Sequence, residues 1–346
     1  MKAFSHLKIE GFSDCHVQGI AIDEKREYMY FSFTTSLVKT DLSGNIVGSV
    51  KGIAGHLGCL SYNSADGRVY GSLEYNNDSI GRGILKTENS DISFDDRFYI
   101  AVFDAEKITR TDMDAEKDGI MTAVFLKDAT DDYNSEGHRY GCSGIDGITF
   151  APAPGEKDGN FIYVAYGIYG DTKRRDNDHQ VLLRYCPEEL KKYERPLNQL
   201  SLHNCGPERP LGKYFALTGN TTYGIQNLEY DRDNNCLFAA VYEGKKLWYP
   251  NYSMYALDIS APSVNKKLKG LSESGEVLSL KKLPFFSRIG KISGCNFPYG
   301  STGMISLRGG SFLFSEDFRN ENGHGTDVYS YKLYPEKGFV KEEILL

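Results

Sequence analysis

The chain has 346 residues, 40% of them hydrophobic and 25% charged, so it is long enough to bury an ordinary hydrophobic core. A net charge of −7 at pH 7 argues against nucleic acid or an anionic membrane as a partner, because both require a basic surface. The amino terminus has no apolar signal-peptide core, and the seven cysteines include no C-x-x-C pair. We therefore expect a cytoplasmic protein with reduced thiols.

A short β-rich unit recurs along the chain. Residues 16–34 contain an apolar alternation (Ile20, Ile22), a charged turn and a second β-rich run, which together predict a tight antiparallel hairpin. Four similar hairpins follow, and two further β-rich runs come after each one. The five predicted units begin near residues 16, 56, 144, 224 and 300.

The register of the hairpins indicates that these units are true repeats. The same position of each second strand carries a small residue, as expected where strands crowd toward one axis: Ser32, Ser72, Ala165, Ala240 and Ser315. We predict an all-β fold, a single five-bladed β-propeller over residues 1–346 with four antiparallel strands per blade. Residues 6–9 predict a strand that closes the ring against the last unit.

The unit starts are unequally spaced, so a six-bladed propeller is the alternative. Its sixth blade would hide in residues 203–223, around the run KYFALTG. In the five-bladed interpretation, the third unit takes its fourth strand from residues 197–202, and the fifth unit takes its last strand from residues 339–346.

Propeller geometry locates a candidate site at the face where first strands begin and second strands end, which we call the top face. Near the axis on this face the sequence places carboxylates, amides and imidazoles, which suit a polar small-molecule site. The candidate catalytic residues are Asp146, Glu74, Asp317 and His16. The candidate ligand-binding residues are Gln18, His56, Gln226, Thr302, Tyr242 and Glu243.

Three runs carry a resemblance to known families: QGIAID from Gln18, DGITFAP from Asp146 and QNLEYDRD from Gln226. They resemble inner-strand motifs of the calcium-dependent gluconolactonase/phosphotriesterase-like propellers and of NHL-repeat proteins. The resemblance implies a metal-dependent hydrolase with a Glu, an Asn and an Asp as ligands. Only Asp146 carries over directly, and Gln18 and Gln226 replace the expected Glu or Asn. That enzyme family is also six-bladed, which disagrees with the count of five.

The sequence therefore predicts metal-assisted hydrolysis of a lactone, an ester or a sugar-type substrate, with a divalent cation such as calcium on Asp146 and Glu74. Two alternatives stay open. One is a glycoside hydrolase in which Asp146, Glu74 and Asp317 serve as acid, base and orienting group. The other is a non-catalytic ligand-binding or interaction propeller. A small-molecule ligand is expected in each case, and the sequence leaves the oligomeric state open.

Overall fold

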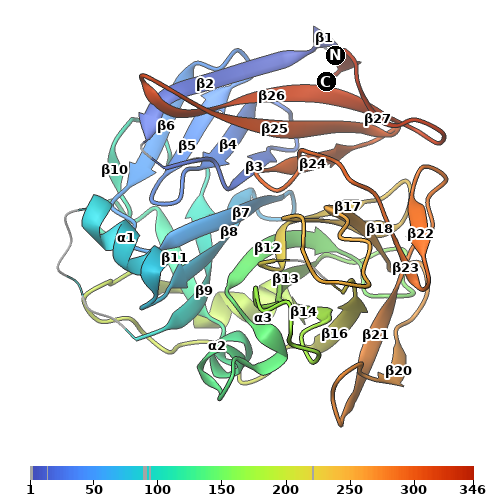
Figure 1. The fold of residues 1–346 in the computed structure, drawn as a ribbon. Coiled ribbons are helices and arrows are strands. Elements are labelled where there is room, and N and C mark those ends of the chain that lie inside the picture. Colours follow the sequence, from blue (N-terminus) through green and yellow to red (C-terminus); the bar gives the residue numbers. More distant parts are fainter. Residues whose placement is uncertain (1–2, 14, 89–91, 93–94, 220–221) are drawn as a thin grey trace.

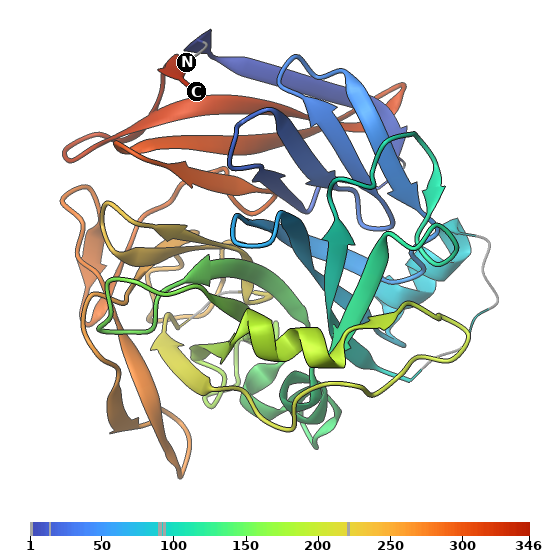
Figure 2. The same ribbon diagram turned by 180° about the vertical axis from the view of Figure 1, so that it is seen from behind.

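The computed structural model describes residues 3–13, 15–88, 92, 95–219 and 222–346. The fold is mostly β and propeller-like, with sheets arranged around a common centre (Figure 1). Seen from behind, the cyan helix (Ser79–Thr87) lies at the edge of the molecule, whereas the yellow-green helix (Pro187–Leu190) lies in front of the sheets (Figure 2). None of the described helices is long and apolar enough to span a membrane.

The first two predicted units each form an antiparallel sheet whose main strands follow one another in the chain. The first sheet contains β3 (Gly19–Ile22), β4 (Tyr28–Ser32), β5 (Leu37–Asp41) and β6 (Ile46–Lys51). The second contains β7 (His56–Asn63), β8 (Arg68–Tyr75), β9 (Arg97–Asp104) and β11 (Met121–Phe125). Short outer strands extend these sheets, β10 (Met113–Asp114) beside β6 and β15 (Arg195–Pro196) beside β11.

The third and fourth units are joined at their outer edges, because β16 and β21 pair in parallel. The third sheet contains β12 (Ile145–Ala151), β13 (Phe161–Gly167), β14 (His179–Tyr185) and β16 (Gly212–Leu217). The fourth contains β17 (Ile225–Asp231), β18 (Cys236–Val241), β19 (Met254–Asp258) and β21 (Ser274–Leu280). Beside them lie β20 (Val264–Lys267), which pairs with β21, and the hairpin of β22 (Ser287–Ile289) and β23 (Ile292–Gly294).

The predicted fourth strand of the third unit, residues 197–202, is wrong. This stretch is irregular: Leu197 is buried among residues of the first two sheets, and the Gln199 side chain bonds to the backbone of Gly52 and Ala54. The strand position is taken by β16, which overlaps the KYFALTG run that was the candidate for a sixth blade. Residues 220 and 221 of that candidate region lie outside the described residues.

The fifth unit combines the two ends of the chain. Its sheet contains β24 (Met304–Leu307), β25 (Ser311–Asn320), β26 (Gly323–Tyr334) and the amino-terminal β2 (His6–Ser13). The prediction that residues 6–9 close the ring is confirmed by the pairing of β2 with β26. The predicted last strand is wrong as one piece, because it is split into β27 (Gly338–Lys341) beside β26 and β28 (Ile344–Leu345) beside β1 (Ala3–Phe4).

The helices occupy connections between strands. They are α1 (Ser79–Thr87), α2 (Lys127–Asn134) and α3 (Pro187–Leu190), with 3₁₀ turns η1 (Arg139–Gly141) and η2 (Lys191–Tyr193). Helix α1 begins after Asp78, whose carboxylate accepts hydrogen bonds from the backbone nitrogens of Ile80 and Gly81. It lies in the insert between β8 and β9, and residues 89–91 and 93–94 of that insert are outside the described part.

The inner strands β3, β7, β12, β17 and β24 contact one another in cyclic order around the centre. The small residues of the predicted column are all buried beside them. Two of these also link neighbouring sheets, because Ser32 of β4 donates to the Gly58 carbonyl of β7 (2.6 Å) and Ser72 of β8 donates to the Asp146 carbonyl of β12 (2.8 Å). Among the described residues, hydrophobic clusters fill the spaces between successive sheets, including the space between the fifth and the first. The radial sheets are therefore held together by apolar packing around a polar centre.

Candidate functional site

A cavity of about 540 Å³ lies where the inner strands begin, on the predicted top face. Seven of the ten residues singled out from the sequence line it: His16, Gln18, His56, Glu74, Asp146, Gln226 and Tyr242. These residues come from the first four units, although they are far apart in the sequence. The volume is in the range of small-molecule sites.

Irregularities in the inner strands aim two of these side chains into the cavity. Pairing of β12 with β13 shifts between Ile145 and Gly147, and pairing of β17 with β18 shifts between Ile225 and Asn227. Asp146 and Gln226 are therefore the extra residues of β-bulges, and such residues are released from the alternation of the strand. Gln226 Nε2 donates to Asp146 Oδ2 at 3.1 Å, so the two bulges present a connected pair.

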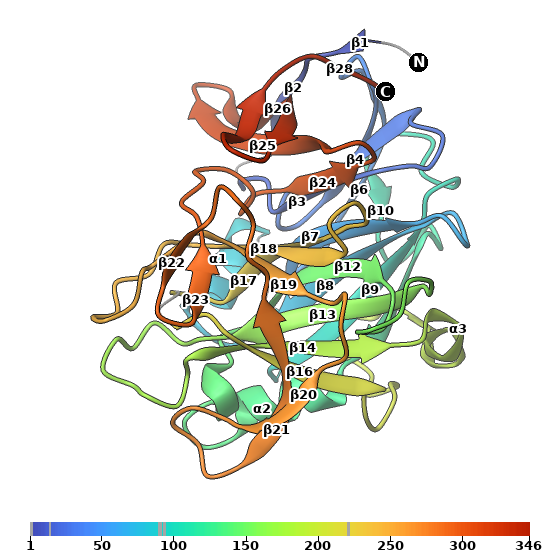
Figure 3. The same ribbon diagram turned by 90° about the vertical axis from the view of Figure 1, so that its right-hand side faces the viewer.

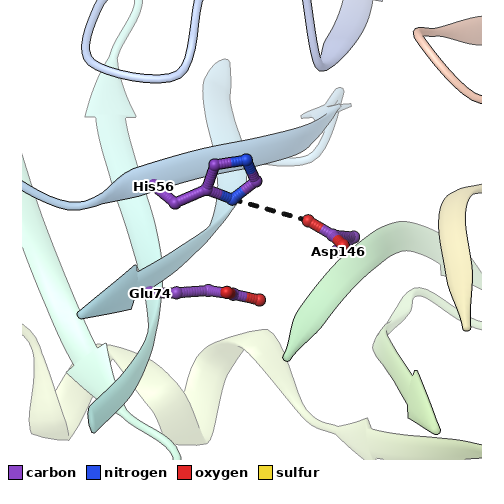
Figure 4. A group of neighbouring side chains, drawn as sticks. All are labelled: His56, Glu74 and Asp146. Atoms are coloured by element: carbon purple, nitrogen blue, oxygen red, sulfur yellow. Dashed lines mark ion pairs between the residues drawn. The ribbon is translucent and has the colours of Figure 1, made fainter. Parts of the chain in front are cut away.

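His56, Glu74 and Asp146 converge in this cavity (Figure 4). One potential ligand atom from each residue lies within 4.8 Å of the other two. His56 Nδ1 and Asp146 Oδ1 are 3.6 Å apart, and neither atom has a hydrogen-bond partner although both are buried. Glu74 is held in place by the backbone nitrogen of Ile145 and by Asn76 Nδ2 (2.9 Å). Two unpaired buried polar atoms that face each other need a common partner.

Two glycines make room for this group. A Cβ atom on Gly144, whose φ is +143°, would lie 2.6 Å from Glu74 Oε1. A Cβ atom on Gly58 would lie 2.5 Å from Ser72 Oγ and 3.0 Å from Asp146 Oδ1. The close approach of backbone to the carboxylates therefore depends on the missing side chains at both positions.

Burial controls the electrostatics of the group. It raises the pKa of Glu74 well above its usual range, and the neighbouring Asp146 charge adds to this effect. Burial also raises the pKa of Asp146, against the opposing hydrogen bond from Gln226. The pKa of His56 is lowered to about 4, mainly by burial, so its imidazole is neutral at neutral pH. A cation would remove the cost of placing two carboxylates together.

His16 and Gln18 form the neighbouring wall. Gln18 Nε2 lies 3.0 Å from His16 Nε2 and donates to Thr34 Oγ1 at 3.2 Å. Burial lowers the pKa of His16, although nearby Asp317 opposes this effect. The rings of His16 and His324 lie 6.0 Å apart, and His324 also lines the cavity.

The other three predicted residues do not line the cavity. Asp317 lies behind it, where its Oδ1 accepts a hydrogen bond from the Val17 nitrogen (3.3 Å) and its Oδ2 is 3.8 Å from His324 Nδ1. Thr302 uses its hydroxyl to donate to the Ser315 carbonyl (3.0 Å), and the side chain of Glu243 is exposed. The acid, base and orienting trio of a glycoside hydrolase is therefore not assembled around this cavity. In addition, Glu74 and Asp146 are closer than the roughly 6.5–9.5 Å that an inverting mechanism requires.

Sequence reasoning missed the apolar side of the cavity. Helix α1 contributes Ile80 and Ile84, and Tyr223 stands at the rim with its ring 6.0 Å from that of Tyr242. The capping Asp78 followed by isoleucines four positions apart was the signal that would have indicated a helix within the insert.

Comparisons with known proteins give structural matches only. No protein-family model and no curated protein matches the chain. The structure is similar to a gluconolactonase from Xanthomonas campestris, with 11% identity and a TM-score of 0.39 over 96% of this chain and 80% of the other. It is also similar to the hydrazine synthase of Kuenenia stuttgartiensis, with 11% identity and a TM-score of 0.36 over 93% of this chain and 64% of the other. At these scores neither match supports an argument about chemistry.

Proposed function

We propose that this protein is a metal-dependent hydrolase of small esters or lactones, built on a ring of five four-stranded units. The observation that carries this proposal is the facing pair of unpaired buried atoms, His56 Nδ1 and Asp146 Oδ1, with the Glu74 carboxylate beside them. The cytoplasmic location and the absence of nucleic-acid and membrane partners remain parts of the same proposal.

The residues present fit a divalent cation. Two ligands about 2.1 Å from a tetrahedral zinc ion lie roughly 3.4 Å apart, and His56 Nδ1 is 3.6 Å from Asp146 Oδ1. A site with one imidazole and two carboxylates favours zinc or manganese over calcium, which prefers six to eight oxygen ligands. A cation held by His56, Glu74 and Asp146 would supply a Lewis acid for a substrate carbonyl and would acidify a bound water.

The remaining polar residues suit hydrolysis. Burial lowers the pKa of His16, and its Nε2 accepts the Gln18 amide, so Nε2 is the unprotonated ring nitrogen. In the proposed reaction, the Gln18 amide releases Nε2 while keeping its bond to Thr34. Water then attacks the carbonyl carbon, and its proton passes to His16 Nε2. The carbon–oxygen bond of the ester or lactone then breaks, and the proton returns to the leaving alkoxide. Gln226 holds the Asp146 carboxylate in position throughout.

The cavity walls limit the substrate. Acidic and imidazole groups lie on one side, whereas Ile80 and Ile84 of α1 form an apolar side. A small ester or lactone with a hydrocarbon portion matches both sides, because its carbonyl can reach the acidic group while its apolar part contacts α1.

The test uses protein treated with EDTA and then titrated with zinc, manganese, calcium or magnesium. At a free concentration of 100 Kd, a cation that binds only the folded state stabilises it by about 2.7 kcal/mol, which appears as a higher melting temperature. Asp146→Asn should abolish this rise, whereas Asp317→Asn is the matched control and should keep it. The same four cations are then tested for hydrolysis of 4-nitrophenyl acetate and δ-valerolactone.

Two results would overturn the proposal in different ways. A protein whose melting temperature ignores all four cations has no metal site here. A protein that binds a cation through Asp146 but hydrolyses neither substrate would be a metal-binding propeller without this chemistry, as in the non-catalytic alternative.

A further inference from the structure

A second surface of the molecule, separate from the metal group, collects positive charge. Two open cavities of about 690 and 790 Å³ flank the Trp248 side chain and share no residue with the candidate site. The residues around them belong to the β20–β21 and β22–β23 hairpins and to the connections 168–178 and 242–253. Figure 3 shows both hairpins on the side that faces the viewer. We call this region the cationic surface.

Nine basic residues line the two cavities of the cationic surface, and three of them, Arg174, Lys246 and Lys269, pair with Asp176 or Asp178. Within the described part of the chain, six of them line the two cavities without an acidic group within 4.0 Å: Lys173, Arg175, Lys266, Lys267, Arg288 and Lys291. A local excess of positive charge acts over about 8 Å at physiological salt, so it decides which ligands approach closely.

Trp248 stands between the two cavities with its side chain directed to solvent. It is 95% exposed and the adjacent Leu247 is 78% exposed. Its backbone φ is +72°, a conformation that a bulky residue adopts only when its surroundings impose it. Trp248 is the single tryptophan of the chain. Core packing does not explain this residue, because nearly all of its side chain is exposed.

Buried contacts on both sides of Trp248 fix the loop. Lys246 is 8% exposed and bonds to Asn177 Oδ1 (2.7 Å) and to Asp178. Tyr249 Oη donates to Asp178 Oδ2 at 2.6 Å. The ring is therefore presented by a rigid base, which reduces the entropy that a ligand must overcome on binding.

We propose that the cationic surface binds an acidic polysaccharide, an unbranched chain of sugar residues that carry carboxylates. Trp248 stacks on the apolar face of one sugar ring, and the lysines and arginines on either side bind the carboxylates of its neighbours. Two cavities of this size on either side of one ring accommodate several linked sugars.

The same observations disfavour other polyanions. A membrane would meet the exposed Leu247 and Trp248, so vesicles are included in the test as a competing surface. Four of the six unpaired cations are lysines, which act as hydrated point charges, whereas bidentate recognition of guanine base edges favours arginine.

The test measures retardation of the purified full-length protein in native gels that contain polygalacturonate. A fully methyl-esterified polygalacturonate has the same backbone without the charge and serves as the ligand control. Trp248→Ala should weaken binding about tenfold, which corresponds to roughly 1.4 kcal/mol of lost contact. The double variant K266E/K267E lies on the exposed β20 and should abolish retardation, while the matched double variant K25E/K107E changes the charge equally and should retain it.

Several outcomes would overturn the proposal. The protein could migrate unretarded through polygalacturonate and alginate at low salt, or it could bind the esterified polymer equally well. Equal losses in K266E/K267E and K25E/K107E would show that only net charge matters. Tighter Trp248-dependent binding to phosphatidylserine vesicles or to single-stranded DNA would assign the surface to a membrane or to nucleic acid instead.

Discussion

Gly58 links the packing of the inner strands to the geometry of the proposed metal site, and Gly58→Ala tests this link. The added Cβ would lie 2.5 Å from Ser72 Oγ and 3.0 Å from Asp146 Oδ1, both closer than ordinary contact. Ser72 cannot retreat without losing its hydrogen bond to the Asp146 carbonyl (2.8 Å). The methyl group therefore has to displace β7, Ser72 or the Asp146 side chain.

Overpacking of this kind costs about 1–3 kcal/mol of unfolding free energy. Measured by urea denaturation of the metal-free protein, we expect a lower midpoint with an unchanged slope. The rise in melting temperature with added zinc or manganese should also shrink, because Asp146 no longer faces His56. The double variant G58A/S72A removes Ser72 Oγ, the atom closest to the added methyl group, and should be more stable than the sum of the two single substitutions predicts. This departure from additivity is the coupling energy between the two positions.

Gly83→Ala is the matched control, because it adds the same methyl group at another residue that lines the cavity. Nothing lies within 4 Å of a Cβ at this position, and replacing a helical glycine by alanine stabilises by roughly 0.5–1 kcal/mol. The expected signs are therefore opposite. A Gly58→Ala protein as stable as the wild type, with a full response to the cation, would refute the proposed coupling.

Two further predictions concern buried charges outside the site. Burial raises the pKa of Glu229 to about 8 despite hydrogen bonds from Ser306 and Thr149, so the folded state holds a proton that the unfolded state releases, and stability falls as the pH rises from about 4.5 to about 8. Glu229→Gln cannot release this proton, so its stability should not fall in the same way. The urea midpoint of the variant, relative to that of the wild type, should therefore be higher at pH 8 than at pH 5. If the difference between the two midpoints is the same at both pH values, the assignment to Glu229 is contradicted. Lys246→Met leaves the buried Asp178 with the half-exposed Lys269, 3.2 Å away, as its remaining cation. The unfolding free energy, measured by urea denaturation, should fall by up to about 3–5 kcal/mol, whereas a loss under about 1 kcal/mol would show that Lys246 is not needed to stabilise Asp178.

Much of the sheet architecture could be predicted from the sequence because it is governed by local alternation. The hairpin from Gly19 to Ser32 pairs in the structure as its apolar pattern indicates, and residues 6–9 pair with β26 as expected of a strand outside the repeats. Errors occur where tertiary contacts override local pattern. The leucine-rich run at residues 197–202 predicts a strand, yet Leu197 and Gln199 serve as fixed contacts between other segments.

The convergence of the site could be predicted only in part, and the reason lies in the bulges. Counting residues along regular strands places Thr302 in the same column as Asp146 and Gln226, but only the latter two interrupt their ladders and turn toward the cavity. A bulge depends on the pairing of two strands and has no composition signal of its own here, so the sequence could name Asp146 without revealing that its Oδ1 would face His56. The third member, Glu74, lies one residue before the end of β8 and pairs with His56 at the start of β7, just beyond a register shift between Leu57 and Leu60. The proposed ligands thus come from two sources, a cross-strand pair of β7 and β8 and a bulge of β12, and a cation would connect the second and third sheets.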